Sequence, residues 1–142
     1  NMALAGISKP ALAKLGCKAV CYMADPDVAV AARAAGTTRA VASMDKACGI
    51  EGPLIVAVGN APTALLRLAE LMDEGKIAPA LVVGVPVGFV NVVESKELFL
   101  DSPVPHIIAR GRKGGSNVAA AICNALVYSA AEMLDPAARG WQ

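Results

Sequence analysis

A loop rich in arginine, lysine and glycine, residues 110–116, holds the side chains best suited to chemistry in this sequence. It places Arg110, Arg112 and Lys113 directly before a Gly-Gly-Ser step. Arginine binds a carboxylate or phosphate through two parallel hydrogen bonds, and a helix that starts at Ser116 favours negative charge at its first turn. The spacing therefore predicts an anion-binding site, with a solvated basic loop as the alternative.

This loop lacks the spacing of the common nucleotide-binding motifs. Lys113 comes before the glycine pair, whereas the lysine of a Walker loop follows its glycines. The sequence also contains no Gly-x-Gly-x-x-Gly run, which dinucleotide-binding proteins place after a strand. A phosphate or nucleotide binder is therefore the weakest of the alternatives.

Two further turns combine glycine with polar or aromatic side chains. Asn60 follows Gly59 after an apolar run, where it is expected to cap the next helix and where free N–H groups can face an anion. Phe89 lies in the loop 84–91, in which a flat ring can lie against a planar ligand. Packing of Phe89 in the core is the alternative.

Three charged residues near these turns read as surface charges when each is taken alone. Arg39 stands at another expected helix start, and Glu94 and Lys96 fit a solvated helix face.

Acid–base and metal chemistry find little support in the sequence. His106 is the single histidine, and its place in an apolar run favours a packed, hydrogen-bonded ring. Any nucleophile–histidine pair elsewhere would need a second histidine. The cysteines, Cys17, Cys21, Cys48 and Cys123, have no zinc spacing and are interpreted as buried reduced thiols, with Cys17 and Cys21 as a ligand pair the alternative. We therefore expect no metal site.

These turns must be positioned by a sheet. Four short apolar runs predict buried strands, and three of them are nearly continuous, as in strands covered on both faces. They span residues 18–23, 54–58, 80–85 and 105–109. Helical patterns alternate with them, so right-handed crossovers and a parallel sheet are expected. Ligands of such sheets bind beyond the carboxyl ends of the strands, where the three turns lie.

Capping signals give the expected helices. Asp25 and Pro26 open the first, which stops at Gly36, and Asn60 with Pro62 opens the third. The expected helical ranges are 25–36, 38–47, 60–75, 92–99 and the segment from 116 onward. The tail, 135–142, contains proline and glycine and is expected to be frayed.

Length and charge narrow the class of protein. A chain of 142 residues, 56% hydrophobic, is long enough for one domain with a real core, so residues 1–142 are read as a single α/β domain. The net charge of +1 gives no global preference for nucleic acid or a membrane surface. The longest apolar stretches are interrupted, so no membrane span is predicted. A cytoplasmic protein is expected.

Taken together, the three turns resemble the signature segments of the precorrin-8X methylmutase family, which includes the cobalt-precorrin-8 methylmutases. The matching segments are residues 59–65, 84–90 with 94–96, and 110–116, supported by 36–39 and 1–7. The resemblance covers about residues 1–130. These motifs are long and ordered, which makes the resemblance specific.

The resemblance implies a flavodoxin-like three-layer sandwich and a homodimer with active sites near the subunit interface. It also implies a cofactor-independent isomerase of cobalamin biosynthesis, which moves a methyl group on a tetrapyrrole to give hydrogenobyrinate or cobyrinate. The tetrapyrrole carries many carboxylates, in agreement with the predicted anion site. Both cobalt-containing and metal-free substrates fit the sequence. A non-catalytic module that binds a tetrapyrrole or another polycarboxylate is the alternative.

Site residues follow from the resemblance and the turns together. The family binds substrate with an arginine at the position of Arg39 and with a residue near Ser8. We add the residues of the three turns, which are Asn60, Phe89, Arg110, Arg112, Lys113 and Ser116.

The resemblance implies that two family features lie upstream of the segment matching Asn1. One is the catalytic histidine, which His106 does not match, so no catalytic residue is expected in this chain. The other is the first, central strand of the sheet. We therefore expect this chain to be the C-terminal part of a methylmutase domain.

Overall fold

The structure is a computed structural model that describes residues 1–140. At its centre lies a three-stranded parallel sheet in the order β1-β2-β3. The strands are β1 (Ile55–Val58), β2 (Leu81–Gly84) and β3 (His106–Ile108). Each lies inside one of the predicted ranges, and the α/β class with a parallel sheet is confirmed.

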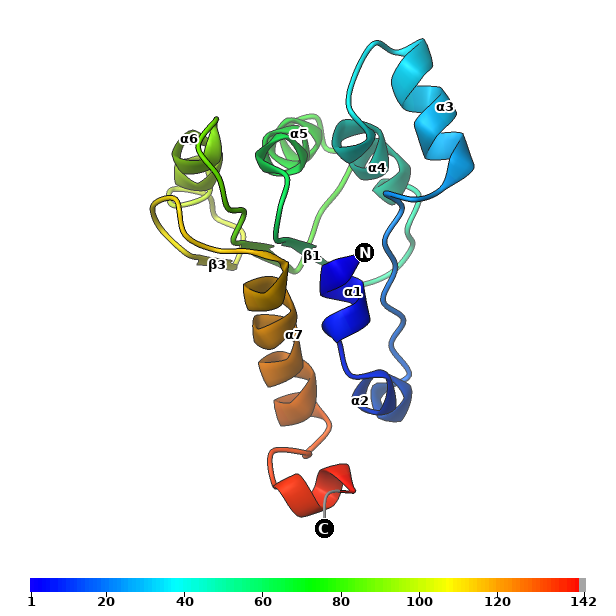
Figure 1. The fold of residues 1–142 in the computed structure, drawn as a ribbon, viewed down its shortest axis with the longest axis vertical. Coiled ribbons are helices and arrows are strands. Elements are labelled where there is room, and N and C mark those ends of the chain that lie inside the picture. Colours follow the sequence, from blue (N-terminus) through cyan, green and yellow to red (C-terminus); the bar gives the residue numbers. More distant parts are fainter. Residues whose placement is uncertain (141–142) are drawn as a thin grey trace.

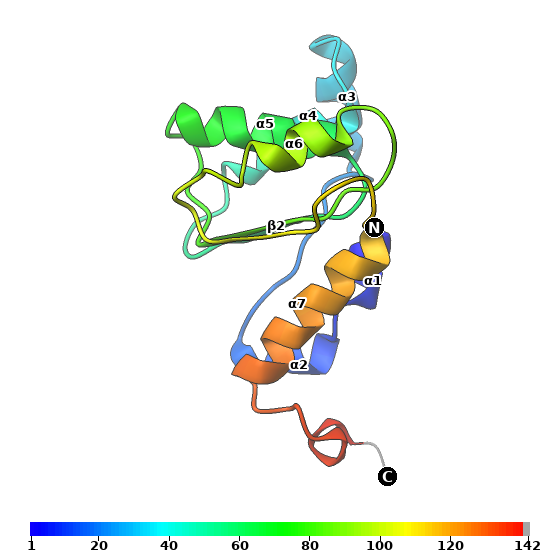
Figure 2. The same ribbon diagram turned by 90° about the vertical axis from the view of Figure 1, so that its left-hand side faces the viewer.

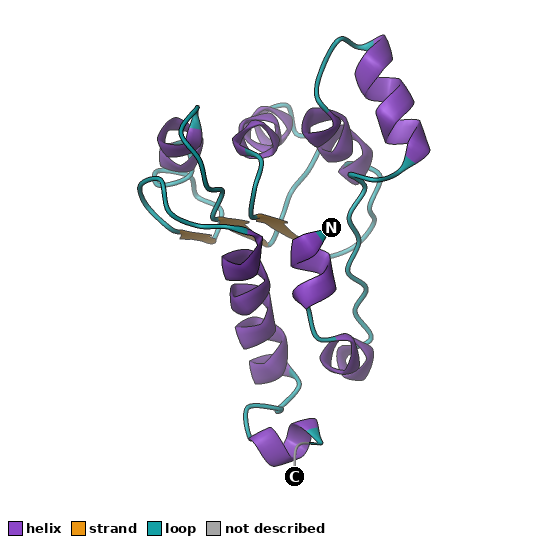
Figure 3. Cartoon of the chain, in the orientation of Figure 1, coloured by secondary structure: helices purple, strands orange, loops and turns teal. Residues whose placement is uncertain are grey.

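Helices cover the sheet on both faces (Figures 1 and 3). Those on one face are α4 (Arg39–Ala47), α5 (Pro62–Asp73) and α6 (Val92–Glu97), with α3 (Pro26–Ala34) outside α4. Those on the other face are α7 (Ser116–Ala130), α1 (Met2–Gly6) and α2 (Lys9–Leu15). A 3-10 turn, η1 (Pro136–Arg139), follows α7. None of the helices formed by residues 1–140 is long and apolar enough to cross a membrane.

The main core lies between the sheet and α5. Val56 and Val58 of β1 pack there against Leu65 and Leu68, which are fully buried. Leu71 is a further buried member of the same apolar face of α5. Burial of such leucines drives folding, and their close packing holds α5 against β1.

The opposite face of the sheet is covered less completely. Val83 and Val85 pack against the first two turns of α7 around Ala119. Beyond these turns α7 leaves the sheet at an angle (Figure 2), and its far half packs against α2. The side chain of Ile55 in β1 is consequently 51% exposed. The expectation that this strand is covered on both faces is therefore wrong.

Residues 18–23, predicted as a strand, form an extended connection between α2 and α3 instead. Within residues 1–140 they pair with no strand. Tyr22 packs beside Val28 and Ala42, and the sulfur of Met23 accepts a hydrogen bond from Ser43. The apolar side chains thus serve contacts with α3 and α4, which single-sequence periodicity does not distinguish from a buried strand.

Two predicted caps differ in detail. Asp25 stands at the N-cap of α3 but makes no side-chain cap bond, because its carboxylate accepts a hydrogen bond from Lys46 at 2.6 Å. The cap of α5 is Ala61 rather than Asn60. Pro62 fixes the helix start and forces the residue before it into an extended conformation, which moves the cap by one position. In the expected frayed tail the structure has η1, capped by Asp135, and residues 141–142 lie outside the described range.

Candidate functional site

The three predicted turns meet at the carboxyl edge of the sheet. The N–H of Gly115 donates to the carbonyl of Val85 at 2.9 Å, which ties the basic loop to the turn after β2. A Cβ added at Gly59 would lie 2.8 Å from the Cα of Ser116, so the turn after β1 touches the start of α7. The parallel register therefore assembles the segments that the sequence keeps far apart.

Gly114 explains why this loop needs its glycine pair. A Cβ at this position would lie 2.1 Å from the carbonyl oxygen of Val85. No side chain fits at that distance, so the backbone of the basic loop can lie against the turn after β2 only with glycine here.

The cations of the loop are available to a ligand. Arg110, Arg112 and Lys113 are exposed, and none forms an ion pair with a carboxylate within residues 1–140. Ser116, half-buried, begins α7, whose first N–H groups have no partner inside the helix. Positive charge and helix start thus coincide, as predicted.

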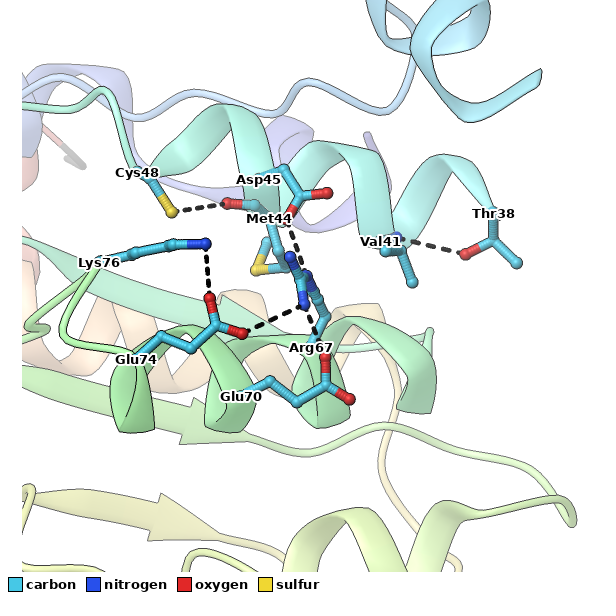
Figure 4. Close-up of polar contacts among 9 residues, drawn as sticks. All are labelled: Thr38, Val41, Met44, Asp45, Cys48, Arg67, Glu70, Glu74 and Lys76. Atoms are coloured by element: carbon cyan, nitrogen blue, oxygen red, sulfur yellow. Dashed lines mark hydrogen bonds and ion pairs between the residues drawn. The ribbon is translucent and has the colours of Figure 1, made fainter. Parts of the chain in front are cut away.

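Some cations elsewhere in the molecule are paired with carboxylates instead. In Figure 4 Arg67 of α5 reaches Asp45 of α4 at 2.7 Å and Glu70 at 2.7 Å. Hydrogen bonds to these two carboxylates raise the pKa of Arg67. Glu74 pairs with Lys76 at 2.6 Å, and this bond lowers the pKa of Glu74. The bond between Arg67 and Asp45 holds α4 to α5, and the cations of this cluster are paired with carboxylates.

Phe89 projects from the turn after β2 and is 83% exposed. The guanidinium of Arg112 lies 5.8 Å from the centre of its ring, within reach of a cation–π interaction. Packing in the core, the alternative for Phe89, is thus wrong. An exposed aromatic ring beside an exposed arginine offers a planar, anionic molecule both an apolar face and a charge.

Arg39 and Asn60 lie at the same end of the helix layer. Figure 4 shows that α4 and α5 run in the same direction, from Thr38 toward Cys48 and from Arg67 toward Glu74. Their first turns are therefore side by side at the carboxyl edge of the sheet. Arg39 and Asn60 are both exposed. Thr38 caps α4 by accepting a hydrogen bond from the N–H of Val41 at 3.2 Å.

Ser8 is not brought to this edge. It caps α2 by accepting from the N–H of Ala11, and its own N–H donates to the side chain of Asn124 at 2.8 Å. Asn124 lies eight residues after the start of α7, which corresponds to a rise of about 12 Å. Ser8 therefore sits beside the middle of α7, apart from the basic loop.

Two residues that sequence reasoning missed stabilise this arrangement. Lys96, expected on a solvated face, is 1% exposed, and its Nζ donates to the carbonyls of Gly111 at 2.7 Å and Lys113 at 2.8 Å. Burial lowers the pKa of Lys96. Its neighbour Glu94 is exposed, as expected. Asn124 is the second, because its side chain accepts from the N–H of Ser8 and donates to the carbonyl of Gly6. No sequence signal indicates that an amide in the middle of a helix makes such contacts.

The histidine and the cysteines of residues 1–140 form no second catalytic or metal site. The Nδ1 atom of His106 lies 2.8 Å from the carbonyl of Val104, so the ring is hydrogen-bonded within its own strand region. Cys17 is exposed, and the other cysteines are half-buried, so the expectation of buried thiols is wrong for Cys17. Within the described chain no group of three or more histidine, cysteine or acidic residues could hold a metal ion.

Comparisons with known proteins agree on one family. A family model described as precorrin-8X methylmutase matches residues 1–129. The cobalt-precorrin-8 methylmutase of Salmonella typhimurium is 50% identical over 129 residues, which cover 90% of this chain and 60% of that protein. The cobalt-precorrin-8 methylmutase of Leptospira interrogans is 43% identical over 135 residues, which cover 89% of this chain and 61% of that protein.

A solved structure gives the same result for the fold. The precorrin-8X methyl mutase of Thermus thermophilus superposes with a TM-score of 0.81 at 42% identity, over 93% of this chain and 64% of that chain. This chain therefore spans less than two thirds of the length of these relatives.

Proposed function

The chain belongs to the precorrin-8X methylmutase family, and we propose that it contributes the carboxylate-binding part of an isomerase of cobalamin biosynthesis. The reaction moves a methyl group between neighbouring ring carbons of precorrin-8X or its cobalt form, giving hydrogenobyrinate or cobyrinate. It is an internal rearrangement, so the protein needs to bind, orient and protonate the ring rather than supply a co-reactant.

One observation carries the proposal: unpaired cations and an exposed ring adjoin one another. Arg112 lies 5.8 Å from the ring of Phe89, with Arg110 and Lys113 exposed in the same loop. A tetrapyrrole presents carboxylates around the edge of a flat macrocycle. We assign the arginines to the carboxylates and Phe89 to the face of the macrocycle.

The remaining site residues have roles by position. Arg39 and Asn60 stand at the helix starts that share the carboxyl edge, where they can bind further carboxylates. Ser116 begins α7 and adds a hydroxyl at its positive end. Ser8 lies beside Asn124 instead, so we assign it to a separate region of the bound substrate. The proton donor is the family's histidine, which we place outside this chain.

Assembly and location are also proposals. We infer a homodimer, in which a second copy covers apolar side chains that are exposed here, such as Ile55 and Val30. Light scattering of the purified protein tests this inference. All four cysteines are free in the structure, which fits a reducing compartment such as the cytoplasm.

The decisive experiment measures isomerisation of precorrin-8X by the natural gene product that contains this sequence. We expect turnover, seen as a change in the visible spectrum, and a rise in KM when Arg112 is replaced by methionine. Methionine at Lys76, whose charge is already paired with Glu74, is the control and should leave KM unchanged. Binding of hydrogenobyrinate without any turnover of precorrin-8X would support a non-catalytic binding module instead.

A further inference from the structure

Lys96 bonds to the basic loop on both sides of Arg112. The two carbonyl groups that accept from its Nζ belong to Gly111 and Lys113, at 2.7 Å and 2.8 Å. The carbonyl of Arg112 itself accepts from the N–H of Gly88 at 3.5 Å. Three successive carbonyl groups of the loop are thus bonded to α6 and to the turn after β2.

These bonds also orient the N–H groups of the loop. All peptide bonds of the structure are trans, so the N–H of each peptide points away from its carbonyl oxygen. Because the carbonyls of Gly111 and Lys113 converge on Lys96, the N–H groups of Arg112 and Gly114 point away from it. Neither of these two N–H groups donates to any group within residues 1–140.

Because Lys96 is buried, its amine depends on the carbonyl groups of the loop for hydrogen bonds. Its side chain is 1% exposed, and no carboxylate of residues 1–140 lies within 4.0 Å of its Nζ. A buried amine needs acceptors, and here the loop supplies them. Water would otherwise compete for the same carbonyl groups, and the loop would lose its single conformation.

We propose that Lys96 is a positioning residue that holds the N–H groups of Arg112 and Gly114 on the side of the loop away from its own amine, where they form a main-chain site for one carboxylate of the ligand. This inference rests on the proposed function, because it names a contact within the same site. Main-chain N–H groups that point in a common direction bind carboxylates well, since their placement costs no side-chain entropy. The side chain of Arg112 then adds its charge to the same carboxylate.

Amide NMR tests the inference on the wild-type protein. Hydrogenobyrinate is titrated into the isotope-labelled natural gene product that contains this sequence, and we expect the amide protons of Arg112 and Gly114 to move downfield as they acquire an acceptor. The amide of Gly49, in the turn after α4, is the control and should not move. Binding that leaves the amides of Arg112 and Gly114 unchanged would overturn the inference and leave the proposed function intact. A complete lack of binding would overturn both.

Variants at Lys96 supply the second measurement. Lys96→Met keeps the apolar stem and removes the donors, so we expect affinity for hydrogenobyrinate to fall about tenfold. Trypsin should cleave after Arg112 and Lys113 faster than in the wild type, because the loop is released. Lys96→Arg retains donors and should restore part of the affinity, whereas Lys76→Met should behave as wild type.

Enzyme kinetics distinguish a positioning role of Lys96 from a general loss of structure. In the natural gene product Lys96→Met should raise the KM for precorrin-8X while kcat changes little, because substrate binding is lost rather than the chemical step. Unchanged KM and an unchanged rate of tryptic cleavage in Lys96→Met would contradict the assigned role.

Discussion

The side chain of Asn124 holds the backbone around Ser8 from both sides of the turn between α1 and α2. Its Oδ1 accepts from the N–H of Ser8 at 2.8 Å, and its Nδ2 donates to the carbonyl of Gly6 at 2.8 Å. Gly6 in turn lies so close to α7 that an added Cβ would be 2.9 Å from the Cβ of Ala120. One amide on α7 therefore positions the N-terminal helices.

Replacing Asn124 with alanine should destabilise the chain by about 1–3 kcal/mol, because a backbone donor and a backbone acceptor both lose their partner. Urea unfolding measures the change in the free energy of unfolding. Ser129→Ala, on an exposed part of the same helix, is the matched control and should change it by less than about 0.5 kcal/mol. Equal stabilities of the two variants would show that the clamp contributes nothing.

The core between the sheet and α5 should depend strongly on Leu68, which is fully buried. Leu68→Ala removes methyl groups and leaves a cavity, at a cost of about 2–5 kcal/mol. Thermal unfolding followed by circular dichroism measures the loss. Leu134→Ala, at a position that is 63% exposed, is the control. A cost below about 1 kcal/mol for Leu68→Ala would mean that the site collapses around the smaller side chain.

Much of this framework is predictable from the sequence. The three strands follow from apolar runs, and the starts of α4 and α7 follow from the expected helical ranges, all of which rest on local signals. The grouping of the three turns follows from the rule that parallel strands share a carboxyl edge. Local signals fail where tertiary contacts determine the conformation of a segment. Residues 18–23 are an example, because their apolar side chains pack on helices and the segment does not join the sheet.

Lys96 illustrates the limit most clearly. Its helical position and its neighbour Glu94 indicate a solvated face, and the average lysine is exposed. Its burial depends on carbonyl groups that follow it by 15 and 17 positions in the chain. Asn124 likewise acts on residues 116 and 118 positions away. Contacts of such separation leave no pattern in the residues around them.

Gly114 should tolerate no side chain. In Gly114→Ala the new Cβ meets the carbonyl of Val85 at 2.1 Å, so the loop must move away from the turn after β2. We expect a cost of about 1–3 kcal/mol together with weaker binding of hydrogenobyrinate. Gly49→Ala, whose Cβ would have an ordinary 3.5 Å contact with a carbonyl, is the control. Unimpaired binding by Gly114→Ala would show that the close packing is not needed for the site.

The link between α3 and α4 should weaken in acid. Asp27 pairs with Lys46 at 2.8 Å, and the hydrogen bond to Lys46 lowers the pKa of Asp27 below its ordinary 3.8. A lowered carboxyl pKa contributes stability above the unfolded-state value, which is lost as pH falls through the folded-state value. Asp27→Asn should therefore be slightly less stable than wild type at pH 7.

Denaturant unfolding at pH 7 and at progressively lower pH measures that difference. It should shrink as pH falls below about 3.8. The pair is exposed, so added salt should also reduce it. A difference that persists undiminished in acid and in high salt would point to a cause other than this ion pair.

Phe89 should matter for binding and hardly at all for stability. Its ring is 83% exposed, so Phe89→Ala removes little buried surface and should change the free energy of unfolding by less than about 0.5 kcal/mol. A ring that stacks on a macrocycle contributes about 1–3 kcal/mol, by analogy with stacking on nucleic acid bases. We therefore expect about a tenfold or larger loss of affinity for hydrogenobyrinate, measured by its visible absorbance. Val90→Ala removes an equally exposed apolar side chain from the same loop, 77% exposed, and should bind as wild type. Equal losses in both variants would assign the effect to the loop as a whole rather than to the aromatic ring.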